Sequence, residues 1–388
     1  MPERGAAVAI SAPSIFDGAH FLQDHCVIVR GDTLQGVVPL AECPAGVALT
    51  ALPDGILAPG LIDLQVNGGG DLMFNNAPCR ETLDAMLGAH RATGTTAMMP
   101  TLISDTDAAR EQAVAAVRAA RAAGNSGILG IHLEGPYFEP GRRGAHRADM
   151  IRTPTPGDIA WLCALTDLQV ILTLAPEHVG PGQIRQLSAS GIHVCAGHTN
   201  ASHARITAAI AQGLQGVTHL FNAMSPLAGR EPGTVGAALA EDRLWAGIIA
   251  DGHHVHPANI RLAQRVKPAG RLVLVSDAMA TVGGRNDSFF LYGEQVGVDS
   301  GKLVNGDGVL AGSAIGMIDA VGYCARTVGI PLEECLRMAS LYPAAILGLD
   351  DRLGRIAGGY RADLVHFDAD FVVRNTWQAG HHQRHRQY

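Results

Sequence analysis

Eight strand-like segments, separated by helix-forming stretches, limit the fold of this chain more than any other sequence feature. Most are short runs of apolar and β-branched residues that end at a polar position. They lie at residues 56–66, 95–103, 127–135, 168–177, 193–198, 216–221, 245–252 and 271–279. Because strands that alternate with helices form parallel sheets, eight such units predict an α/β fold, a (β/α)8 TIM-like barrel.

Helical stretches fall between most of these segments. The clearest is DAAREQAVAAVRAARAAG, which is rich in helix-forming residues, begins after Ser104-Asp105 and ends at Gly124. Other helices are expected to begin near Glu81, Ser202 and Pro257, with a later pair at about 313–328 and 331–348. We expect the later pair to close the barrel.

The two ends of the chain differ from its middle in their pattern, because they show short strands and turns without intervening helices. Residues 1–57 contain short strands joined by turns, such as HCVIVRGD and LQGVVP, and GRIAGGYRADLVHFDADFVV near the C-terminus is alike. We therefore expect a small β-sandwich domain formed from both chain ends, residues 1–57 and 346–388, beside a barrel at 58–345. The last ten residues, AGHHQRHRQY, are expected to form a frayed end.

Nearly every predicted barrel strand ends in a residue that can take part in chemistry. These residues are Gln65, Asn67, Thr101, Glu134, Glu177, His198, His219, Asp251 and Asp277. In a β/α barrel the C-terminal ends of the strands meet at one mouth, where active sites lie. The sequence therefore predicts one site that collects these side chains.

Glu134, His198 and His219 end three of these strands and form a candidate metal site. Two imidazoles with one carboxylate suit zinc or a similar divalent ion, and three protein ligands leave a position open for water. Asp277 ends a further strand and is the natural general acid and base beside such a water. His132 lies one layer deeper on the Glu134 strand, where we expect it to support the site rather than bind metal.

Lysine is almost absent, which excludes one kind of metal site. Only Lys267 and Lys302 occur, and neither lies on a predicted barrel strand. A two-metal site bridged by a carboxylated strand lysine is therefore excluded. Cys195 lies three residues before His198, but strand alternation faces it away, so we expect it to pack in the core.

The overall charge and the cysteines argue against several classes of function. A net charge of −7 and a pI near 6.2 are atypical of proteins that bind nucleic acid through bulk electrostatics. The seven cysteines are scattered, with no Cys-x-x-Cys pair, which indicates a reducing compartment. No apolar run reaches the roughly 18–20 residues of a membrane helix, and no signal peptide is recognisable. We expect a cytoplasmic protein without a nucleic-acid or membrane partner.

Seven segments follow one another in a specific order along the chain. They are APGLIDLQVNGGG (58–70), HLEGPYFEPGRRGAH (132–146), AGHTNAS (196–202), THLFNAMSPLAGREPG (218–233), ADGHHVHPAN (250–259), VSDAM (275–279) and LAGS (310–313). In this order and spacing the chain resembles the amidohydrolase superfamily and, within it, the family of N-acetylglucosamine-6-phosphate deacetylases. The likeness spans nearly the whole chain and is strongest over about 50–365. It implies a metal-dependent hydrolase built on the predicted barrel.

One position departs from the superfamily's usual pattern, a His-x-His pair at the end of the first barrel strand. Here that position reads Gln65-Val66-Asn67. Because amides are poor metal ligands, the departure implies one metal ion per subunit, expected to be zinc, rather than two. The same variant occurs within the deacetylase family, where Gln65 is expected to hold a water near the metal.

The resemblance also assigns roles in catalysis. Glu134, His198 and His219 match the metal ligands, in agreement with the analysis above. Asp277 matches the catalytic acid and base. His146, in the segment RRGAH, matches a residue that meets the substrate and helps to polarise the acetamide carbonyl.

Further matching positions are expected to contact the sugar. Asn222 and Ala223 match a segment whose backbone contacts the phosphosugar. Ala311, Gly312 and Ser313 match a loop that lines the sugar site. These roles rest on the resemblance alone.

Arg230 and His254 match a pair that binds the substrate phosphate. In the family this pair reaches in from a neighbouring subunit, which implies a homodimer. Arg230 also suits the role chemically, because a guanidinium binds phosphate with bidentate geometry. Arg142 and Arg143, in the loop before His146, are expected on the surface.

The implied reaction is metal-dependent hydrolysis of the acetamide of N-acetylglucosamine 6-phosphate to glucosamine 6-phosphate and acetate, in amino-sugar catabolism. The nearest alternative is the same reaction on N-acetylgalactosamine 6-phosphate, which differs in the configuration of one hydroxyl. A cyclic-amide hydrolase usually needs the His-x-His pair and the strand lysine, both missing here. A sugar-phosphate-binding protein without turnover would show damage to Asp277 or to a metal ligand, and the sequence shows none.

Overall fold

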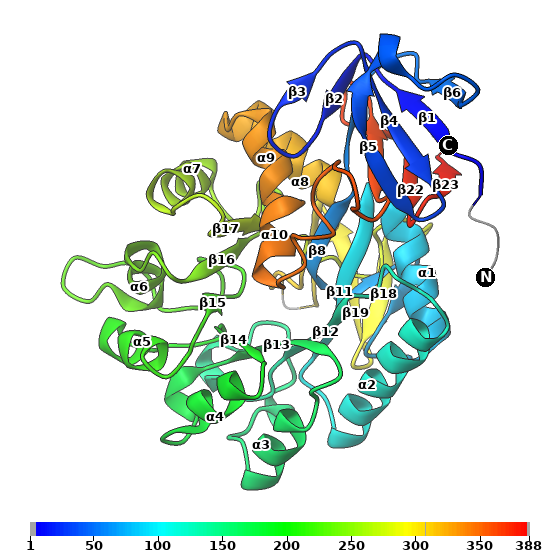
Figure 1. The fold of residues 1–388 in the computed structure, drawn as a ribbon. Helices are drawn as coiled ribbons and strands as arrows, with labels where there is room; N and C mark the ends of the chain where they lie inside the picture. The colour runs from blue at the N-terminus through cyan, green and yellow to red at the C-terminus, as the bar shows by residue number, and fades with distance from the viewer. Residues whose placement is uncertain (1–4, 307, 386–388) are drawn as a thin grey trace.

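Eight parallel strands form the central sheet of the computed structural model, which describes residues 5–306 and 308–385 (Figure 1). The strands are β8 (Leu61–Val66), β11 (Thr95–Ile103), β12 (Gly130–Glu134), β13 (Gln169–Leu174), β14 (His193–Ala196), β15 (Gly216–Val217), β16 (Trp245–Ile248) and β17 (Leu272–Leu274). Each strand pairs in parallel with the next in this series. The predicted (β/α)8 barrel is confirmed.

The sheet closes into a barrel between its first and last strands. Val66 at the end of β8 and Ala278 beyond β17 form a parallel bridge. The Asp277 N–H donates to the Gln65 carbonyl at 3.0 Å, and the Asn67 N–H donates to the Ala278 carbonyl at 2.9 Å. These contacts place Gln65, Asn67 and Asp277 beside one another at the C-terminal end of the barrel.

A buried carboxylate, which the sequence analysis missed, links the same two strands one layer deeper. Asp63 on β8 is fully buried and accepts hydrogen bonds from the N–H groups of Gln65 and Ser276 at 3.1 and 3.2 Å. The Ser276 hydroxyl donates to the other Asp63 oxygen. Burial raises the pKa of Asp63 to about 7, while these hydrogen bonds act in the opposite direction. Asp63 thus ties the backbone before Asp277 to the backbone of β8.

Helices surround the barrel on its outer side (Figure 1). They are α1 (Arg80–Arg91), α2 (Asp107–Ala122), α3 (Pro156–Cys163), α4 (Gln183–Ala189), α5 (His203–Ile210), α6 (Gly233–Ala240), α7 (Pro257–Val266), α8 (Met317–Tyr323), α9 (Leu332–Met338) and α10 (Leu341–Ile346). Side-chain caps fix two of the predicted starts. Thr106 accepts the Ala109 N–H before α2, and Ser202 accepts the Arg205 N–H before α5.

The last two helices differ from the prediction of one helix at 331–348. Pro343 has no N–H, and in a continuous helix its ring would clash with the carbonyl four residues earlier. The backbone leaves helical geometry at Ser340, where φ is −139° and ψ is −73°. Pro343 then lies in the first turn of α10, a position where proline is tolerated.

Both chain ends contribute to two further β-sheets. The four-stranded sheet has the order β5-β4-β1-β6, and the six-stranded sheet has the order β23-β22-β21-β7-β2-β3. Their strands are β1 (Val8–Ser11), β2 (Ser14–Phe16), β3 (Phe21–Leu22), β4 (His25–Arg30), β5 (Thr33–Pro39), β6 (Ala48–Ala51), β7 (Ile56–Pro59), β21 (Leu364–Phe367), β22 (Val373–Gln378) and β23 (His381–Arg384). One apolar core joins Ile10 and Val27 of the first sheet to Leu364 and Trp377 of the second. The predicted small sandwich is confirmed.

Two predictions about these ends are wrong in detail. The first strand candidate, 56–66, divides at Gly60 into β7 of the six-stranded sheet and β8 of the barrel. A side chain at Gly60 would clash with Thr96, so the link between the sandwich strand β7 and the barrel strand β8 requires glycine. The expected frayed end forms β23, which pairs with β22 after a turn in which Ala379 and Gly380 both have positive φ. Residues 386–388 of that segment, like residues 1–4 of the predicted N-terminal part, lie outside the described residues.

A three-stranded antiparallel sheet that the sequence analysis does not predict follows the last barrel strand. It consists of β18 (Ser288–Leu291), β19 (Glu294–Asp299) and β20 (Lys302–Val304). Its apolar residues Phe289, Leu291 and Val296 pack in one cluster with Ile103 and Met279. Because those two residues lie just beyond or at the ends of barrel strands, the added sheet covers one side of the barrel mouth.

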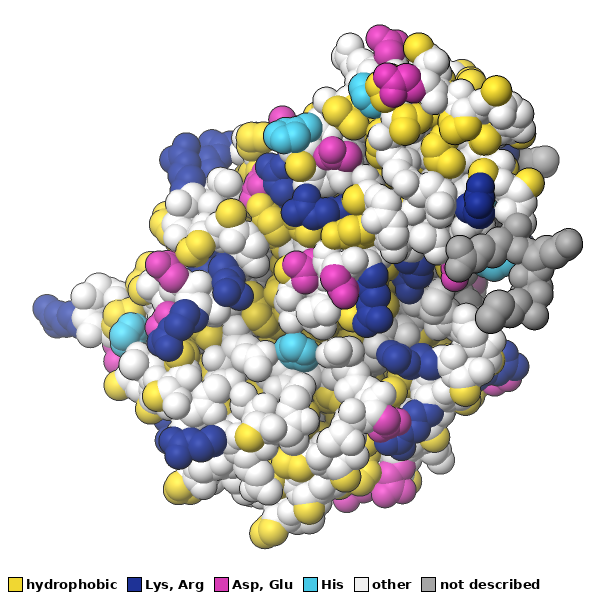
Figure 2. Space-filling model, viewed as in Figure 1, with side chains coloured by type: hydrophobic (Ala, Val, Ile, Leu, Met, Phe, Trp, Pro, Cys, Tyr) yellow, Lys and Arg dark blue, Asp and Glu magenta, His cyan; other side chains and the backbone are white. Residues whose placement is uncertain are grey.

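The charged side chains are spread over the surface. Figure 2 shows basic and acidic side chains interspersed over one face, without a broad field of one sign. In the part of the chain that the structure describes, no helix is long and apolar enough to cross a membrane. Because this face carries mixed charges, a charged ligand that binds here would be recognised by nearby side chains rather than by a net surface potential.

A buried ion cluster holds α2 and α3 against the loop that follows β12. Asp158 in the first turn of α3 accepts hydrogen bonds from Arg110 at 2.8 Å and from Arg152 at 2.5 and 2.7 Å. Arg110 also donates to the Tyr137 hydroxyl at 2.6 Å, three residues beyond Glu134. Although burial opposes it, these hydrogen bonds hold the pKa of the Asp158 carboxyl well below its usual range.

Replacement of Asp158 by Asn should lower the free energy of unfolding at pH 7 by about 3 kcal/mol, because two arginines lose a buried charge partner. The folded pKa of Asp158 is depressed, so its stabilisation is present above the unfolded pKa of about 3.9 and is lost as the pH falls toward the folded value. The difference between wild type and variant should therefore shrink between pH 4 and pH 2. Chemical denaturation across this range measures both effects.

Asp167→Asn is the matched control for this prediction. It removes the pair between Arg118 and Asp167, whose side chains are 46% and 53% exposed, against 7% and 3% for Arg110 and Asp158. Exposed pairs contribute under about 1 kcal/mol. Equal losses of stability in the two variants would contradict the assignment of the cluster as a buried support.

Candidate metal and catalytic site

A cavity of about 290 Å³ opens at the C-terminal ends of the barrel strands. Among the predicted site residues, those that line it are Asn67, Glu134, His146, His198, His219, Asn222, Ala223, His254, Asp277 and Gly312. Its volume lies at the lower end of the range for ligand pockets, so it suits one small molecule. The predicted convergence of strand ends thus holds for Asn67, Glu134, His198, His219 and Asp277, which meet in one cavity.

Glu134, His198 and His219 bring three ligand atoms to one point. Glu134 Oε1 lies 3.1 Å from His198 Nε2 and 3.0 Å from His219 Nε2, and the two Nε2 atoms are 3.0 Å apart. All three side chains are buried. Glu134 ends β12, while each histidine follows the end of its strand by two residues. Together they form a buried group that could hold a metal ion.

The protonation of His198 shows that this group fits a cation. His198 Nδ1 lies 2.8 Å from the Arg142 carbonyl oxygen, which can only accept, so Nδ1 carries a proton. In the neutral ring, Nε2 then presents a lone pair to the Glu134 carboxylate. A lone pair and a carboxylate oxygen repel each other unless a cation lies between them. Imidazole nitrogens with one carboxylate are the ligands that zinc and related divalent ions take.

Three of the site residues have backbone conformations that favour glycine. The φ angle is +48° at His198, +35° at His219 and +52° at Asp277. The left-handed region costs a residue with a Cβ roughly 1–2 kcal/mol. Each of these residues follows a barrel strand, and the sharp turn brings its side chain to the cavity. Strain of this kind is typical of functional sites.

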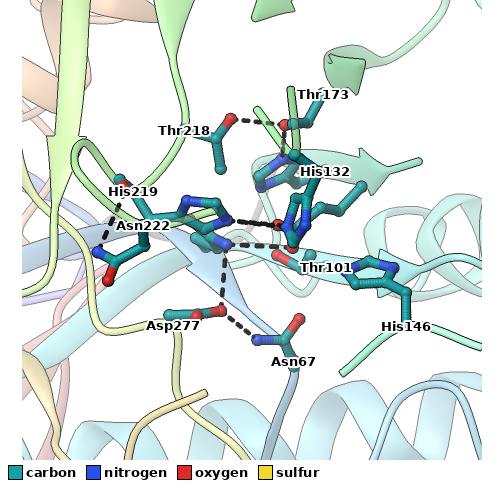
Figure 3. A network of polar contacts seen from close by, with 12 residues as sticks. Asn67, Thr101, His132, His146, Thr173, Thr218, His219, Asn222 and Asp277 are labelled. Carbon is teal, nitrogen blue, oxygen red and sulfur yellow. Dashed lines mark hydrogen bonds and ion pairs between the residues drawn. The ribbon is translucent and has the colours of Figure 1, made fainter. Parts of the chain in front are cut away.

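Two side-chain amides hold Asp277. Asn67 Nδ2 donates to Asp277 Oδ1 at 2.7 Å (Figure 3). Gln65 Nε2 donates to the same oxygen at 3.1 Å. Asp277 Oδ2 has no hydrogen-bond partner among the described residues. Burial raises the pKa of Asp277 to about 6, and the charge of Glu134 acts in the same direction. One oxygen of Asp277 is therefore fixed, and the other is available for reaction.

Gln65 joins the candidate metal-ligand group of Glu134, His198 and His219 to the Asp277 carboxylate. Its Nε2 also donates to Glu134 Oε2 at 3.1 Å, so one amide nitrogen bridges two carboxylates. This contact uses the amide as a donor, in keeping with the weakness of amides as metal ligands. The expected role of Gln65, holding a water near the metal, stays a prediction.

His146 lies beside the metal-ligand group, with its ring 4.6 Å from that of His198. Its Nδ1 accepts the Ser104 N–H at 3.2 Å and lies 2.8 Å from the Ser104 hydroxyl. A backbone N–H only donates, so Nδ1 is unprotonated and the neutral ring carries its proton on Nε2. Burial holds the pKa of His146 well below its usual range, which favours the neutral ring. Figure 3 shows His146 and Asp277 on different sides of the group.

The segment after β15 reaches the cavity through Asn222 and Ala223. Asn222 Nδ2 donates to the His219 carbonyl at 3.2 Å, which fixes the side chain against a ligand residue. The Ala223 carbonyl accepts the Thr199 N–H at 3.0 Å, and φ at Ala223 is +48°. Both residues are therefore held in place before a substrate arrives.

Only Gly312 of the predicted loop 311–313 lines the cavity. Ala311 packs behind it in the apolar cluster of the added sheet, and the Ser313 hydroxyl donates to the Ser276 carbonyl at 2.6 Å. Gly312 has φ +67°, and a Cβ there would lie 2.6 Å from Met279 Cε. The wall of the cavity at this point is therefore bare backbone.

The two predicted phosphate contacts are in different places. His254 lines the cavity of its own chain, with Nδ1 2.6 Å from Asp251 Oδ2, so it needs no neighbouring subunit to reach this site. Arg230 lies in the exposed loop 226–231 and does not line the cavity. Among the described residues it has no hydrogen bond or ion pair. The expectation that both residues reach a neighbouring site is therefore corrected for His254.

Other strand-end residues support the barrel instead of the cavity. The Thr101 hydroxyl accepts the Val66 N–H at 2.9 Å, and Glu177 accepts the Asn200 N–H at 2.6 Å. His132 Nε2 lies 2.7 Å from the Thr173 hydroxyl below the site, and burial lowers the pKa of His132 to about 4 (Figure 3). Cys195 is fully buried. The expected supporting role of His132 and packing role of Cys195 agree with these contacts.

Arg142 is a site residue that sequence reasoning placed on the surface. It lines the cavity, and its carbonyl accepts the hydrogen bond from His198 Nδ1 at 2.8 Å. Its guanidinium donates to Asn200 Oδ1 at 3.2 Å. Because the loop has little regular structure, its path could not be derived from sequence periodicity.

Comparisons with known proteins match nearly the whole chain. The amidohydrolase family matches residues 56–382, and the NagA composite domain matches residues 9–56. An N-acetylgalactosamine-6-phosphate deacetylase from Shewanella sp. (strain ANA-3) is 42% identical over 94% of this chain and 95% of that protein. An N-acetylglucosamine-6-phosphate deacetylase from Haemophilus influenzae is 36% identical over 92% of this chain and 93% of that protein.

Solved structures agree with this assignment. N-acetylglucosamine-6-phosphate deacetylase from Pasteurella multocida has a TM-score of 0.94 at 38% identity, covering 98% of this chain and 100% of that chain. An aspartate-to-alanine mutant of the Mycobacterium smegmatis enzyme, in complex with N-acetyl-D-glucosamine-6-phosphate, has a TM-score of 0.89 at 30% identity, covering 97% and 99%. The chain therefore belongs to the amidohydrolase family, in the group of deacetylases that these relatives form.

Proposed function

We propose that this protein hydrolyses the acetamide of N-acetylglucosamine 6-phosphate, giving glucosamine 6-phosphate and acetate. The observation that carries the proposal is the buried group of Glu134, His198 and His219 beside Asp277, which has one oxygen free. The relatives named above support the substrate class. All seven cysteines are unpaired, which fits a cytoplasmic enzyme of amino-sugar catabolism.

Asp277 moves the proton in the proposed reaction. One divalent metal ion, zinc in our proposal, held by Glu134, His198 and His219 would lower the pKa of water and polarise the acetamide carbonyl. Asp277 Oδ2 accepts a proton from the attacking water as the new C–O bond forms. The same oxygen returns the proton to the departing nitrogen as the C–N bond breaks, so one carboxyl serves as base and then acid.

His146 and the walls of the cavity orient the acetamide. The Nε2–H of His146 is placed to donate to the carbonyl oxygen, where negative charge develops. Asn222, Ala223 and the bare backbone at Gly312 offer fixed surfaces for the sugar. Because these groups are held by the fold, little reorganisation is needed when the substrate binds.

The phosphate is expected to bind at the outer end of the cavity. His254 can donate to it from the same chain, and its bond to Asp251 keeps the ring in place. We propose that Arg230 comes from a second copy of the chain, because its loop is exposed and its guanidinium is unpaired among the described residues. The working form would then be a homodimer with two shared sites.

N-acetylgalactosamine 6-phosphate is a second candidate substrate. The observation in its favour is the 42% identity to a deacetylase of that sugar. The two sugars differ only at one hydroxyl, away from the acetamide on which the site acts. The ratio of kcat/KM for the two phosphosugars decides between them, and a strong preference for the galactosamine epimer would overturn our first choice.

The function itself is tested by acetate release from the metal-loaded protein. We expect turnover of N-acetylglucosamine 6-phosphate, a much higher KM for N-acetylglucosamine without phosphate, and about one divalent ion per chain by elemental analysis. Binding of the phosphosugar without acetate release would identify a sugar-phosphate-binding protein instead. Equal kcat/KM with and without the phosphate would remove the phosphate from the proposal.

Asp277→Asn should lower kcat by about a thousandfold, because an amide can neither accept nor return the proton. The metal content should stay unchanged, since Asp277 is not one of the three ligands. Asp149→Asn, an exposed carboxylate beside the barrel mouth, is the control and should retain full activity. Loss of metal in Asp277→Asn would show that Asp277 is a ligand.

The proposed sharing of Arg230 predicts complementation between two impaired variants. Arg230→Ala should raise KM for the phosphosugar, so activity is measured well below that KM, and Asp277→Asn should have the low kcat given above. When the two proteins are unfolded and refolded together, mixed dimers gain one intact site, so activity should return to about a quarter of the wild-type value. If no activity returns although mixed dimers form, Arg230 does not act across an interface.

A further inference from the structure

The hairpin of β18 and β19 has an unusual residue at its tip. Leu291 pairs with Glu294, so the turn consists of Tyr292 and Gly293. Both turn residues have positive φ, +54° at Tyr292 and +83° at Gly293. Such turns favour Asn, Asp or Gly at the first position, and a bulky aromatic residue there is an outlier. The strain indicates that the Tyr292 side chain is required at this place.

The Tyr292 hydroxyl connects the hairpin to the catalytic site through one residue. It donates a hydrogen bond to the carbonyl of Ser104, the residue that follows β11. Ser104 in turn offers its N–H to His146 Nδ1 at 3.2 Å, with its hydroxyl 2.8 Å from the same nitrogen. The hydroxyl of Tyr292 and the imidazole of His146 thus bind different groups of one residue, the carbonyl of Ser104 and its N–H and hydroxyl.

The packing around Ser104 leaves it little freedom. Gly135, directly after Glu134, has φ +89°, and a side chain there would clash with the Ser104 hydroxyl and lie 2.8 Å from the Phe138 ring. The Phe138 ring meets His146 edge-on at 4.9 Å and stacks on His198 at 4.3 Å. A shift of Ser104 would therefore be passed to the ring of His146.

We infer that Tyr292 is a positioning residue for His146, which it aligns through Ser104 so that Nε2–H faces the acetamide oxygen of the substrate. The inference rests on the proposed function only for the role of His146 in catalysis. The alignment itself is a property of the folded protein. It gives the added sheet β18–β20 a part in catalysis, because this sheet carries Tyr292 to the barrel mouth.

A packing role alone would not need the hydroxyl. The Tyr292 ring packs against the apolar cluster of the added sheet, and a phenylalanine would keep that contact. Tyr292→Phe therefore removes the bond to the Ser104 carbonyl and leaves the packing. Tyr360→Phe is the matched control, because the Tyr360 hydroxyl also donates to a backbone carbonyl, that of Asp350 at 2.6 Å, on the surface of the small sandwich.

Two measurements test the inference on the zinc-loaded, full-length protein. Steady-state acetate release should show kcat about tenfold lower in Tyr292→Phe, with KM within about twofold of the wild type. Two-bond ¹⁵N–¹H spectra of histidine-labelled protein, assigned with His146→Gln, should show a pure Nε2–H tautomer of His146 in the wild type. In Tyr292→Phe a second tautomer or a broadened signal is expected. Tyr360→Phe should match the wild type in both measurements.

The outcomes separate this inference from the proposed function. An unchanged His146 spectrum in Tyr292→Phe would overturn the alignment, whatever happens to kcat. A changed spectrum with unchanged kcat would show that the alignment has no part in catalysis, and would also overturn the inference. If the wild type releases no acetate, the proposed function fails, while the spectra still test the alignment. A thermal midpoint near that of the wild type excludes misfolding as the cause of any change.

Discussion

The contact between β8 and β17 at the barrel mouth is the one on which the site depends. These strands are the two ends of an eight-stranded series, and only their meeting brings Gln65 and Asn67 to Asp277. Below them, Asp63 accepts hydrogen bonds from Gln65 on β8 and from Ser276, two residues after β17, and so fixes the position of one segment along the other. A barrel open at this seam would keep the three candidate metal ligands, which follow or end other strands, but would lose Asp277, the carboxylate that we propose moves the proton.

The amide of Gln65 reduces the repulsion between two carboxylates that the closed barrel brings together. Glu134 and Asp277 are both carboxylates and face the same small cavity, so their charges repel. Gln65 Nε2 lies 3.1 Å from an oxygen of each carboxylate and donates a hydrogen bond to both without adding a charge of its own. An imidazole at this position would place a metal ligand there instead. Gln65 therefore orients the Asp277 carboxylate, and in our proposal it also limits the site to one metal ion.

Much of the site could be predicted because parallel strands leave few choices. Once Glu134, His198 and His219 are assigned to strand ends, the barrel brings these ends to one mouth, and the turns at the two histidines complete the arrangement. Features that depend on single turns were harder to predict. The signals were present: Gly60 divides two strands, Pro343 divides two helices, and Tyr292-Gly293 makes a tight turn. Arg142 and Asp63 gave no such signal, because their contacts join segments far apart along the chain.

The small sandwich can be completed only after the C-terminal part of the chain has been synthesised. Strand β7 pairs with β2 on one side and with β21 on the other, and β21 is roughly 300 residues further along the sequence. During synthesis β7 therefore has an open edge while the whole barrel is being made, and open edges invite pairing with other chains. The first barrel strand, β8, begins directly after β7, so this open edge lies next to the start of the barrel until β21 is made. Chains that stop early would thus expose a β-strand edge next to an unfinished barrel, a state that favours aggregation and removal over partial activity.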